Sequence, residues 1–154
     1  YSINALVSVE AIEGRLAKVP GAGWITASHL APIGTVEDDW ASVAQQFLGA
    51  PYLWGGRESL GLDCSGLVQQ ALFACGRACA RDADQQEEMG LEIATGDFTR
   101  GDLVFWMGHV AIGLGDGQII HANGHHMAVA IEPLAEAIAR IGAGGSQPTS
   151  YRRI

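Results

Sequence analysis

The sequence is poor in positive charge. It holds 9 Lys and Arg against 17 Asp and Glu, which gives a formal net charge of -8. Arg152-Arg153 is its only adjacent basic pair. A chain of this charge is repelled by the phosphates of nucleic acid and by an anionic membrane surface. We therefore expect no nucleic-acid partner.

Cysteines and long apolar runs are also scarce. Cys64, Cys75 and Cys79 are too few and too clustered for a disulfide framework, and the odd count leaves at least one thiol free. No CxxC or paired Cys/His spacing indicates a metal site, so we expect no metal or other cofactor, and we interpret Cys75 and Cys79 as fillers of a helix core. No apolar run approaches the roughly 18 residues of a membrane span. The chain begins at Tyr1 rather than Met, so a leader or a further domain could have been removed.

The 154 residues are enough for one well-cored domain and a fragment of a second. Residues 1–33 have small-β composition, with strand-like pieces at 5–10, 15–19 and 21–26. Pro and Gly interrupt the pattern in residues 31–35, which read as a linker. We place a boundary near residue 34, and so expect segments 1–33 and 34–154.

Beyond the linker, three expected helices precede a run of strands. The first helix is predicted by the spacing of Trp40, Val43, Ala44, Phe47 and Leu48, and the second by Leu67, Val68, Ala71 and Leu72. A short polar helix is expected within residues 81–90. Residues 103–106 are apolar at odd and even positions alike, so both faces of the strand are apolar, which is typical of a strand at the centre of a sheet. Further strands are expected at 109–114, 118–123, 130–132 and 150–154, with a helix after Pro133.

Asp63-Cys64-Ser65-Gly66 lies where a glycine-rich loop turns into the second helix. A thiol at a helix N-terminus sits at the positive end of the peptide dipoles, which favours the thiolate. Asp63 or Ser65 could cap this helix, and Tyr52 and Trp54 in the preceding loop can wall a cleft. A lone cysteine is more often a buried structural residue, so its interpretation depends on two histidines downstream.

His109 and His121 lie on the two strands of an expected hairpin. A two-residue loop at Asp116-Gly117 would turn the histidines to opposite faces. A three-residue loop, residues 115–117 closed by a left-handed Gly117, pairs Ala111 with His121 and puts both histidines on one face. We predict the three-residue loop and both histidines facing Cys64.

These residues together supply what a thiol nucleophile needs. His109 would be the base and ion-pair partner, and His121 would hold its ring in the useful orientation and tautomer, with the protonation of His121 left open. The backbone N–H of Cys64 and the hydroxyl of Tyr52 are the candidate donors to an oxyanion. His125 and His126 follow in a turn and are expected at the rim.

Six motifs, in order along residues 34–132, resemble the NlpC/P60 family of papain-like cysteine peptidases. They are Pro51-Tyr52-x-Trp54-Gly55-Gly56, Gly61-x-Asp63-Cys64-Ser65-Gly66-Leu67-Val68, Arg81-Asp82-Ala83-Asp84-Gln85-Gln86, Gly101-Asp102-Leu103-Val104-Phe105-Trp106, His109-Val110-Ala111-Ile112 and Ile120-His121-Ala122. The resemblance implies an α+β fold in which a central antiparallel sheet packs against N-terminal helices. It also implies hydrolysis of bacterial cell-wall (murein) peptides, commonly at the γ-D-glutamyl-diamino acid bond, with Cys64 as nucleophile, His109 as base, His121 as third polar residue and Tyr52 on the oxyanion side.

The same resemblance suggests substrate contacts. Family residues that match Asp63 and Ser65 help to bind the free amine of an N-terminal L-Ala, although helix capping is an equal alternative for Asp63. Arg81 belongs to a cleft-rim motif, and Trp54 is expected beside the substrate. The alternatives to a peptidase are an amidase or acyltransferase that uses the same Cys and His pair, and a non-catalytic wall-binding module.

Residues 1–33 resemble the last strands of a bacterial SH3-like domain through Gly23-Trp24-Ile25 and the later Leu30. Domains of that kind precede the NlpC/P60 catalytic domain, and the first strands of the module are missing here. The resemblance implies a bacterial protein. A cytoplasmic location is slightly favoured, and a periplasmic or secreted one stays open because the true N-terminus is not visible. The Asp63 and Ser65 pattern and the acidic surface favour small soluble peptides as substrates.

Overall fold

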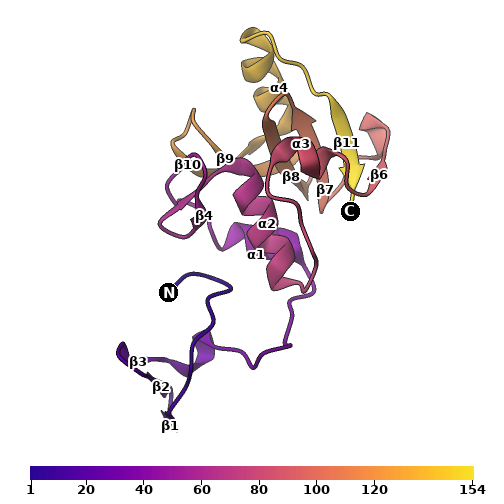
Figure 1. Cartoon of the computed structure of the whole chain (residues 1–154). Helices are drawn as coiled ribbons and strands as arrows, with labels where there is room; N and C mark the ends of the chain where they lie inside the picture. Colours follow the sequence, from indigo (N-terminus) through magenta and orange to yellow (C-terminus); the bar gives the residue numbers. More distant parts are fainter.

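The computed structural model describes residues 1–154 and separates a small N-terminal sheet from a larger body (Figure 1). The small sheet is antiparallel in the order β1 (Ala11–Glu13), β2 (Leu16–Val19) and β3 (Gly23–Thr26), followed by the short helix η1 (Ala27–His29). The expected strand at 5–10 was wrong. The turn at Gly14, with φ of +57°, folds residues 11–13 back onto β2 instead.

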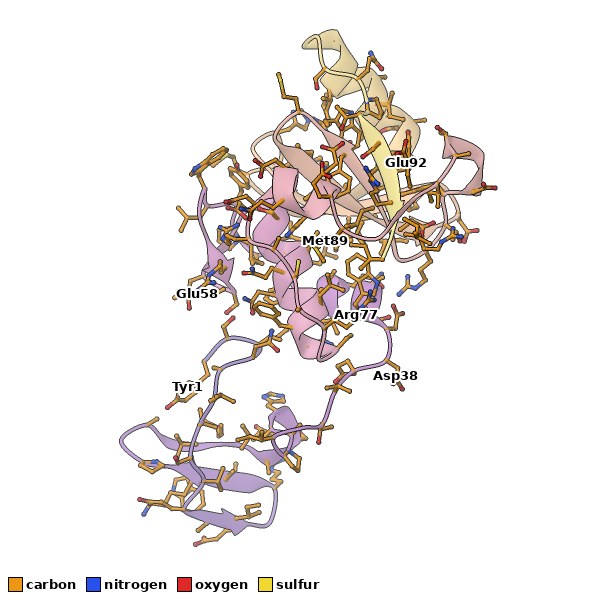
Figure 2. The ribbon with its side chains drawn as sticks, turned by 45° about the vertical axis from the view of Figure 1, so that its right-hand side comes forward. Tyr1, Asp38, Glu58, Arg77, Met89 and Glu92 are labelled. Carbon is orange, nitrogen blue, oxygen red and sulfur yellow. The ribbon has the colours of Figure 1, made fainter.

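Two segments join this sheet to the body. Residues 30–39 lead past Asp38 into the first helix of the body (Figure 2), and residues 2–4 contact the body directly. The hydroxyl of Ser2 accepts a hydrogen bond from the Ser59 N–H at 2.9 Å. The Asn4 side-chain amide donates to the carbonyl and to the side chain of Gln70, both at 2.9 Å.

The body contains a six-stranded sheet of order β10-β9-β8-β7-β11-β6, all of whose pairs are antiparallel. Its strands are β6 (Leu91–Glu92), β7 (Asp102–Trp106), β8 (His109–Gly115), β9 (Gln118–Asn123), β10 (Ala128–Pro133) and β11 (Ser150–Arg153). Every residue of β7 is buried, which confirms the prediction of a central strand. The C-terminal strand is also confirmed, because β11 lies between β7 and β6.

Helices cover the two faces of the sheet. They are α1 (Trp40–Gln45), α2 (Cys64–Ala74), α3 (Ala83–Glu87) and α4 (Leu134–Ala143), with the short helix η2 (Thr95–Asp97) and a small hairpin of β4 (Arg57–Glu58) and β5 (Gly61–Leu62). One core packs α1 and α2 on alternate residues such as Val110, Ile112 and Ile120. A second core contains the strand side chains that point to the opposite face of the sheet, including Ala111 and Ile119, together with Ala137 of α4. The α+β fold is therefore confirmed.

Two details of the predicted core need correction. Leu48 was expected on the buried face of the first helix, but α1 ends at Gln45 and Leu48 is 55% exposed. Cys75 and Cys79 were interpreted as helix-core residues. Cys75 follows α2 as its C-terminal cap and Cys79 lies in the loop beyond, and both are only partly buried against the edge of the core.

The β8–β9 hairpin reaches the predicted register by a different route. Its loop has two residues, Asp116 and Gly117, whose φ angles of +50° and +70° are those of a type I′ turn. Gly115 pairs with Gln118, and a bulge between Gly113 and Gly115 then shifts the pairing by one residue. The prediction of a three-residue loop was therefore wrong. The pair Ile112–Ile120 nevertheless has the predicted register, because the bulge supplies the same shift.

Candidate active site

Cys64 is the first residue of α2, and Asp63 caps this helix. The Asp63 carboxylate accepts a hydrogen bond from the Gly66 N–H at 2.7 Å, which satisfies one of the unpaired amides of the first turn. Gly66 has a steric reason to be glycine, since a Cβ there would clash with the carbonyl of Gly56 in the preceding loop. The loop and the helix start are thus held close together.

Arg81 pairs with the carboxylate of Asp63. Its guanidinium donates to both Asp63 oxygens, at 3.0 and 2.6 Å, and to the hydroxyl of Ser65 at 3.0 Å. The Gly55 N–H also donates to Asp63, at 2.9 Å. Burial by itself would raise the pKa of Asp63, but the hydrogen bonds from Arg81 and Gly66 and the charge of Arg81 hold it below its ordinary value. Asp63 is therefore an ionised cap with a paired charge.

The Cys64 thiol is in a desolvated environment, with 8% of the residue exposed. Burial raises the pKa of Cys64, and the nearby Asp63 charge raises it further, whereas the backbone N–H of Val110 favours the thiolate. We expected the helix N-terminus to lower this pKa. The direction is the opposite, because desolvation outweighs the backbone N–H groups.

Tyr52 lies close to the same thiol. Burial raises its pKa, and the charges of Cys64 and Asp63 add to the effect. Tyr52 is partly buried against the main core, and its backbone N–H donates to the carbonyl of Met127 at 3.0 Å. Its phenol therefore stays protonated near neutral pH and can donate a hydrogen bond.

The rings of His109 and His121 are in contact. Their centroids are 5.0 Å apart, and Nε2 of His109 lies 2.8 Å from Nδ1 of His121. The prediction that the two share a face of the sheet is confirmed. Because side chains alternate along β8, the histidines lie on the same face of the sheet as Ala111, which packs in the core with α4. Cys64 packs with Val110 in the other core, with α2. The thiol lies against the N–H of Val110, the residue after His109 at the start of β8, so Cys64 and the two histidines do not share one face of the sheet as predicted.

Glu132 extends the histidine pair into β10. Its Oε1 lies 2.6 Å from Nε2 of His121, and Arg140 of α4 pairs with the same oxygen. Burial lowers the pKa of His109 to about 3, with the charges of His121 and Arg140 adding to it. Burial also lowers the pKa of His121 to about 4, against the opposing pull of Glu132. Both imidazoles are neutral near pH 7.

Sequence reasoning missed Glu132 and Arg140. The period of two along β10 puts Ala130 opposite His121, so Glu132 is its diagonal neighbour on the same face. The period of two along β10 could therefore have predicted that Glu132 neighbours His121. Arg140 contacts it from a separate helix, and no local pattern predicts such a contact.

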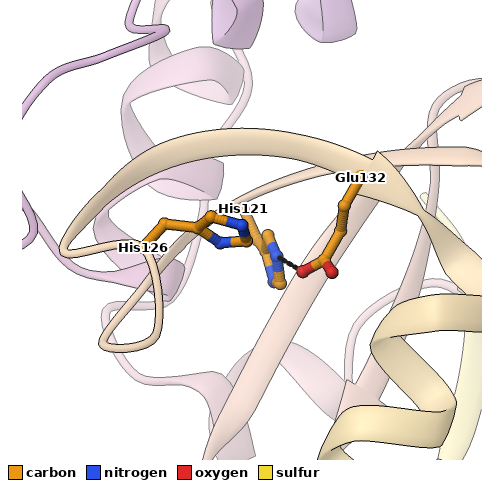
Figure 3. A group of neighbouring side chains, drawn as sticks. All are labelled: His121, His126 and Glu132. Atoms are coloured by element: carbon orange, nitrogen blue, oxygen red, sulfur yellow. Dashed lines mark hydrogen bonds and ion pairs between the residues drawn. The ribbon is translucent and has the colours of Figure 1, made fainter.

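Three side chains near this point could together hold a metal ion. Ligand atoms of His121, His126 and Glu132 lie within 4.8 Å of one another (Figure 3). Both ring nitrogens of His121 already have protein partners, and the cation Arg140 is paired with Glu132. A second cation beside Arg140 would be repelled, so these residues fit a hydrogen-bonded chain better than a metal centre.

The remaining predicted residues surround this centre. Ser65 is buried in the first turn of α2, and Trp54 is 82% exposed on the loop before it. His125 and His126 are exposed on the β9–β10 turn. They line a cavity of about 400 Å³ together with Glu132, Glu136 and Arg140.

A helix-start cysteine and a strand-borne histidine pair thus occur together on an antiparallel sheet, in the arrangement that the resemblance to papain-like peptidases implied. Residues 49–140 match the NlpC/P60 family, and the chain belongs to that family.

Relatives and solved structures agree. The chain is 32% identical, over 136 residues, to the gamma-D-glutamyl-L-lysine dipeptidyl-peptidase of Bacillus subtilis, covering 80% of this chain and 46% of that protein. It is 32% identical over 107 residues to the peptidoglycan endopeptidase RipB of Mycobacterium tuberculosis, covering 58% of this chain and 44% of that protein. The chain thus spans less than half of the length of each of these two curated relatives.

Two solved structures extend the likeness to the fold. A crystal structure of an NlpC/P60 family protein from Bacillus cereus superposes with a TM-score of 0.80 at 27% identity, over 99% of this chain and 54% of that one. The NlpC/p60 domain of the peptidoglycan hydrolase SagA gives 0.63 at 31% identity, over 75% of this chain and 96% of that one.

None of the helices combines the length and apolar character needed to cross a bilayer.

Proposed function

We propose that the chain is a cysteine peptidase that hydrolyses murein peptides at the γ-D-glutamyl-diamino acid bond. The observation that carries this is that the Cys64 thiol lies against the backbone N–H of Val110, the residue directly after His109, whose ring is hydrogen-bonded to His121. The relative from Bacillus subtilis is a γ-D-glutamyl-L-lysine dipeptidyl-peptidase, which supports this bond and the release of a dipeptide.

In the proposed reaction, Cys64 attacks the γ-carbonyl while His109 takes the thiol proton. Because burial keeps both groups neutral at rest, the proton moves as the sulfur attacks rather than before substrate binds. The backbone N–H of Cys64 and the Tyr52 hydroxyl donate to the oxyanion. His109 then gives its proton to the leaving amine, and water hydrolyses the thioester with His109 again as base.

We propose that Asp63 and Ser65 help to hold the free amine of an N-terminal L-Ala. Placing the Asp63 carboxylate near the nucleophile costs free energy. Arg81 offsets this cost, because it hydrogen-bonds to Asp63 and to Ser65. An incoming amine would share Asp63 with Arg81. Trp54, exposed on the adjoining loop, would cover the peptide.

We further propose that residues 1–33 are the last strands of an SH3-like domain and that the catalytic domain begins near residue 34. The antiparallel β1-β2-β3 sheet and the short helix η1 after it support this. Hydrogen bonds of Ser2 and Asn4 with Ser59 and Gln70 tie the chain ahead of the small sheet to the catalytic domain.

The test is incubation with L-Ala-γ-D-Glu-diaminopimelate and with the L-Lys counterpart, followed by mass spectrometry. We expect L-Ala-γ-D-Glu and the free diamino acid, no product from Cys64→Ala, and full activity from the matched Cys75→Ala. Blocking the N-terminal amine by acetylation should slow the reaction if Asp63 binds it. Equal turnover by Cys64→Ala would eliminate the mechanism, and absence of cleavage by the wild-type chain would eliminate this substrate.

A further inference from the structure

The buried Glu132 and the partly exposed Arg140 form an ion pair behind the catalytic histidines and have no part in the bond-making and bond-breaking steps of the proposed reaction. Glu132 is 8% exposed, and its carboxylate lies between His121 of β9 and Arg140 of α4. His126 is the other titratable side chain near His121, with ring centroids 6.4 Å apart, and Glu136 lines the cavity beside them. A buried carboxylate with two charge-assisted partners has a defined orientation.

The hydrogen bonds of this group leave a single consistent set of tautomers. Burial would raise the pKa of Glu132, but the bonds from His121 and Arg140 hold it below its ordinary value, so its oxygens can only accept. Nε2 of His121 must therefore carry a proton. Since His121 is neutral, its Nδ1 has the lone pair and accepts from Nε2–H of His109. The lone pair of His109 is then on Nδ1.

We propose that Glu132, held by Arg140, is the positioning residue that sets the tautomers of His121 and His109 so that Nδ1 of His109 is the base for Cys64. This rests on the proposed function. When the Sγ–H bond of Cys64 breaks, the proton goes to Nδ1 of His109 and the electron pair stays on sulfur to form the bond to the carbonyl carbon. The resulting imidazolium donates through Nε2–H to His121, whose Nε2–H donates to Glu132. The Glu132 charge therefore stabilises the imidazolium without taking a proton.

Glu132→Gln is the direct test, because it keeps the shape and removes the charge. A Gln side chain can turn its NH₂ toward His121, which forces a proton onto Nδ1 of His121 and leaves His109 with the wrong tautomer. We expect kcat for the peptide to fall about 10- to 100-fold with KM within about twofold. Glu136→Gln is the matched control, since Glu136 lines the same cavity without a bond to His121, and it should retain wild-type kcat.

Two readouts separate this role from a merely structural one and from the substrate assignment. Nitrogen-15 NMR of histidine-labelled wild-type protein at pH 7 should show Nε2–H tautomers for both His109 and His121, and Glu132→Gln should change the tautomer of His109. The rate of Cys64 alkylation by iodoacetamide should fall in the same variant at pH 7. Both measurements hold even if the chain cleaves no murein peptide, and the first needs no variant to fold.

The proposal is overturned if wild-type His109 is the Nδ1–H tautomer, or if Glu132→Gln leaves kcat, alkylation rate and tautomers unchanged. Arg140→Gln is the second variant, expected to show a smaller loss because Glu132 keeps its bond to His121. A variant in which His109 no longer has the Nε2–H tautomer and kcat falls supports the proposal. A fall in kcat with both tautomers unchanged counts against it.

Discussion

Each of the two buried carboxylates beside the site is paired with an arginine. Asp63 and Arg81 lie at the start of α2, and Glu132 and Arg140 lie behind the histidines. A buried carboxylate without a partner would take up a proton, because desolvation disfavours its charge. The arginines keep both groups ionised, so Asp63 can cap a helix and Glu132 can accept from His121.

The charge of Asp63 should be visible in the pH dependence of stability. Its pKa is lower in the folded chain than in the unfolded one. The stabilisation is therefore complete above the unfolded value and is lost as the pH falls through the folded value. Asp63→Asn keeps a capping side chain but removes the charge, and should lower the free energy of unfolding by about 1.5–3 kcal/mol at pH 7.

Urea unfolding from pH 7 down to pH 3 measures this difference. The gap between wild type and Asp63→Asn should narrow as the wild-type carboxylate becomes protonated. Asp38→Asn, at an exposed position before α1, is the control and should track wild type at each pH. A gap of constant size across the series would mean that shape, not charge, is what Asp63 contributes.

At the scale of elements, the β8–β9 hairpin decides which side chains meet. The bulge at Gly113–Gly115 compensates for the two-residue turn and keeps Ile112 opposite Ile120. A shift by one residue would send His109 and His121 to opposite faces. The geometry of this turn therefore determines how the histidines of the site are arranged, although no residue of the turn contacts the site.

The turn depends on a left-handed backbone at Gly117. A Cβ at this position would meet no atom within 4 Å, so the cost of Gly117→Ala comes from its φ of +70° alone. We expect the free energy of unfolding to fall by about 1–2 kcal/mol. Gly96→Ala is the matched control, with equally open space and no positive φ, and should stay within about 0.5 kcal/mol of wild type. Equal stability of the two variants in urea would contradict the type I′ turn.

This hairpin also marks how far sequence could predict the molecule. Periodicity is local, so the central strand β7, the helix at Cys64 and the C-terminal strand β11 followed from spacing. The shared face of the histidines followed as well, although through the wrong loop, because a bulge leaves no simple residue pattern. The raised pKa of Cys64 and the contact of Arg140 with Glu132 depend on packing between distant segments. Spacing along the chain contains no information about either.

At the scale of the whole molecule, the small sheet and the body meet through very few contacts. Only Ala17 and Val19 are buried in the small sheet, and neither belongs to a core of the body. Its position therefore depends on the linker at 30–39 and on residues 2–4. The second of these reaches Ser59, on the loop between β4 and β5 that lies close to Trp54 in the chain.

Removing the contacts of residues 2–4 should loosen that loop without unfolding the body. Ser2→Ala deletes the acceptor for the Ser59 N–H, and Asn4→Gly deletes the bonds to Gln70 while tolerating the φ of +67° at this position. In the double variant we expect hydrogen exchange at Ser59 to rise about tenfold, the equivalent of about 1.4 kcal/mol, while amides of β7 keep their protection. Ser8→Ala, an exposed serine of the same segment, is the control. Unchanged exchange at Ser59 would mean that the Ser2 hydroxyl does not protect this amide.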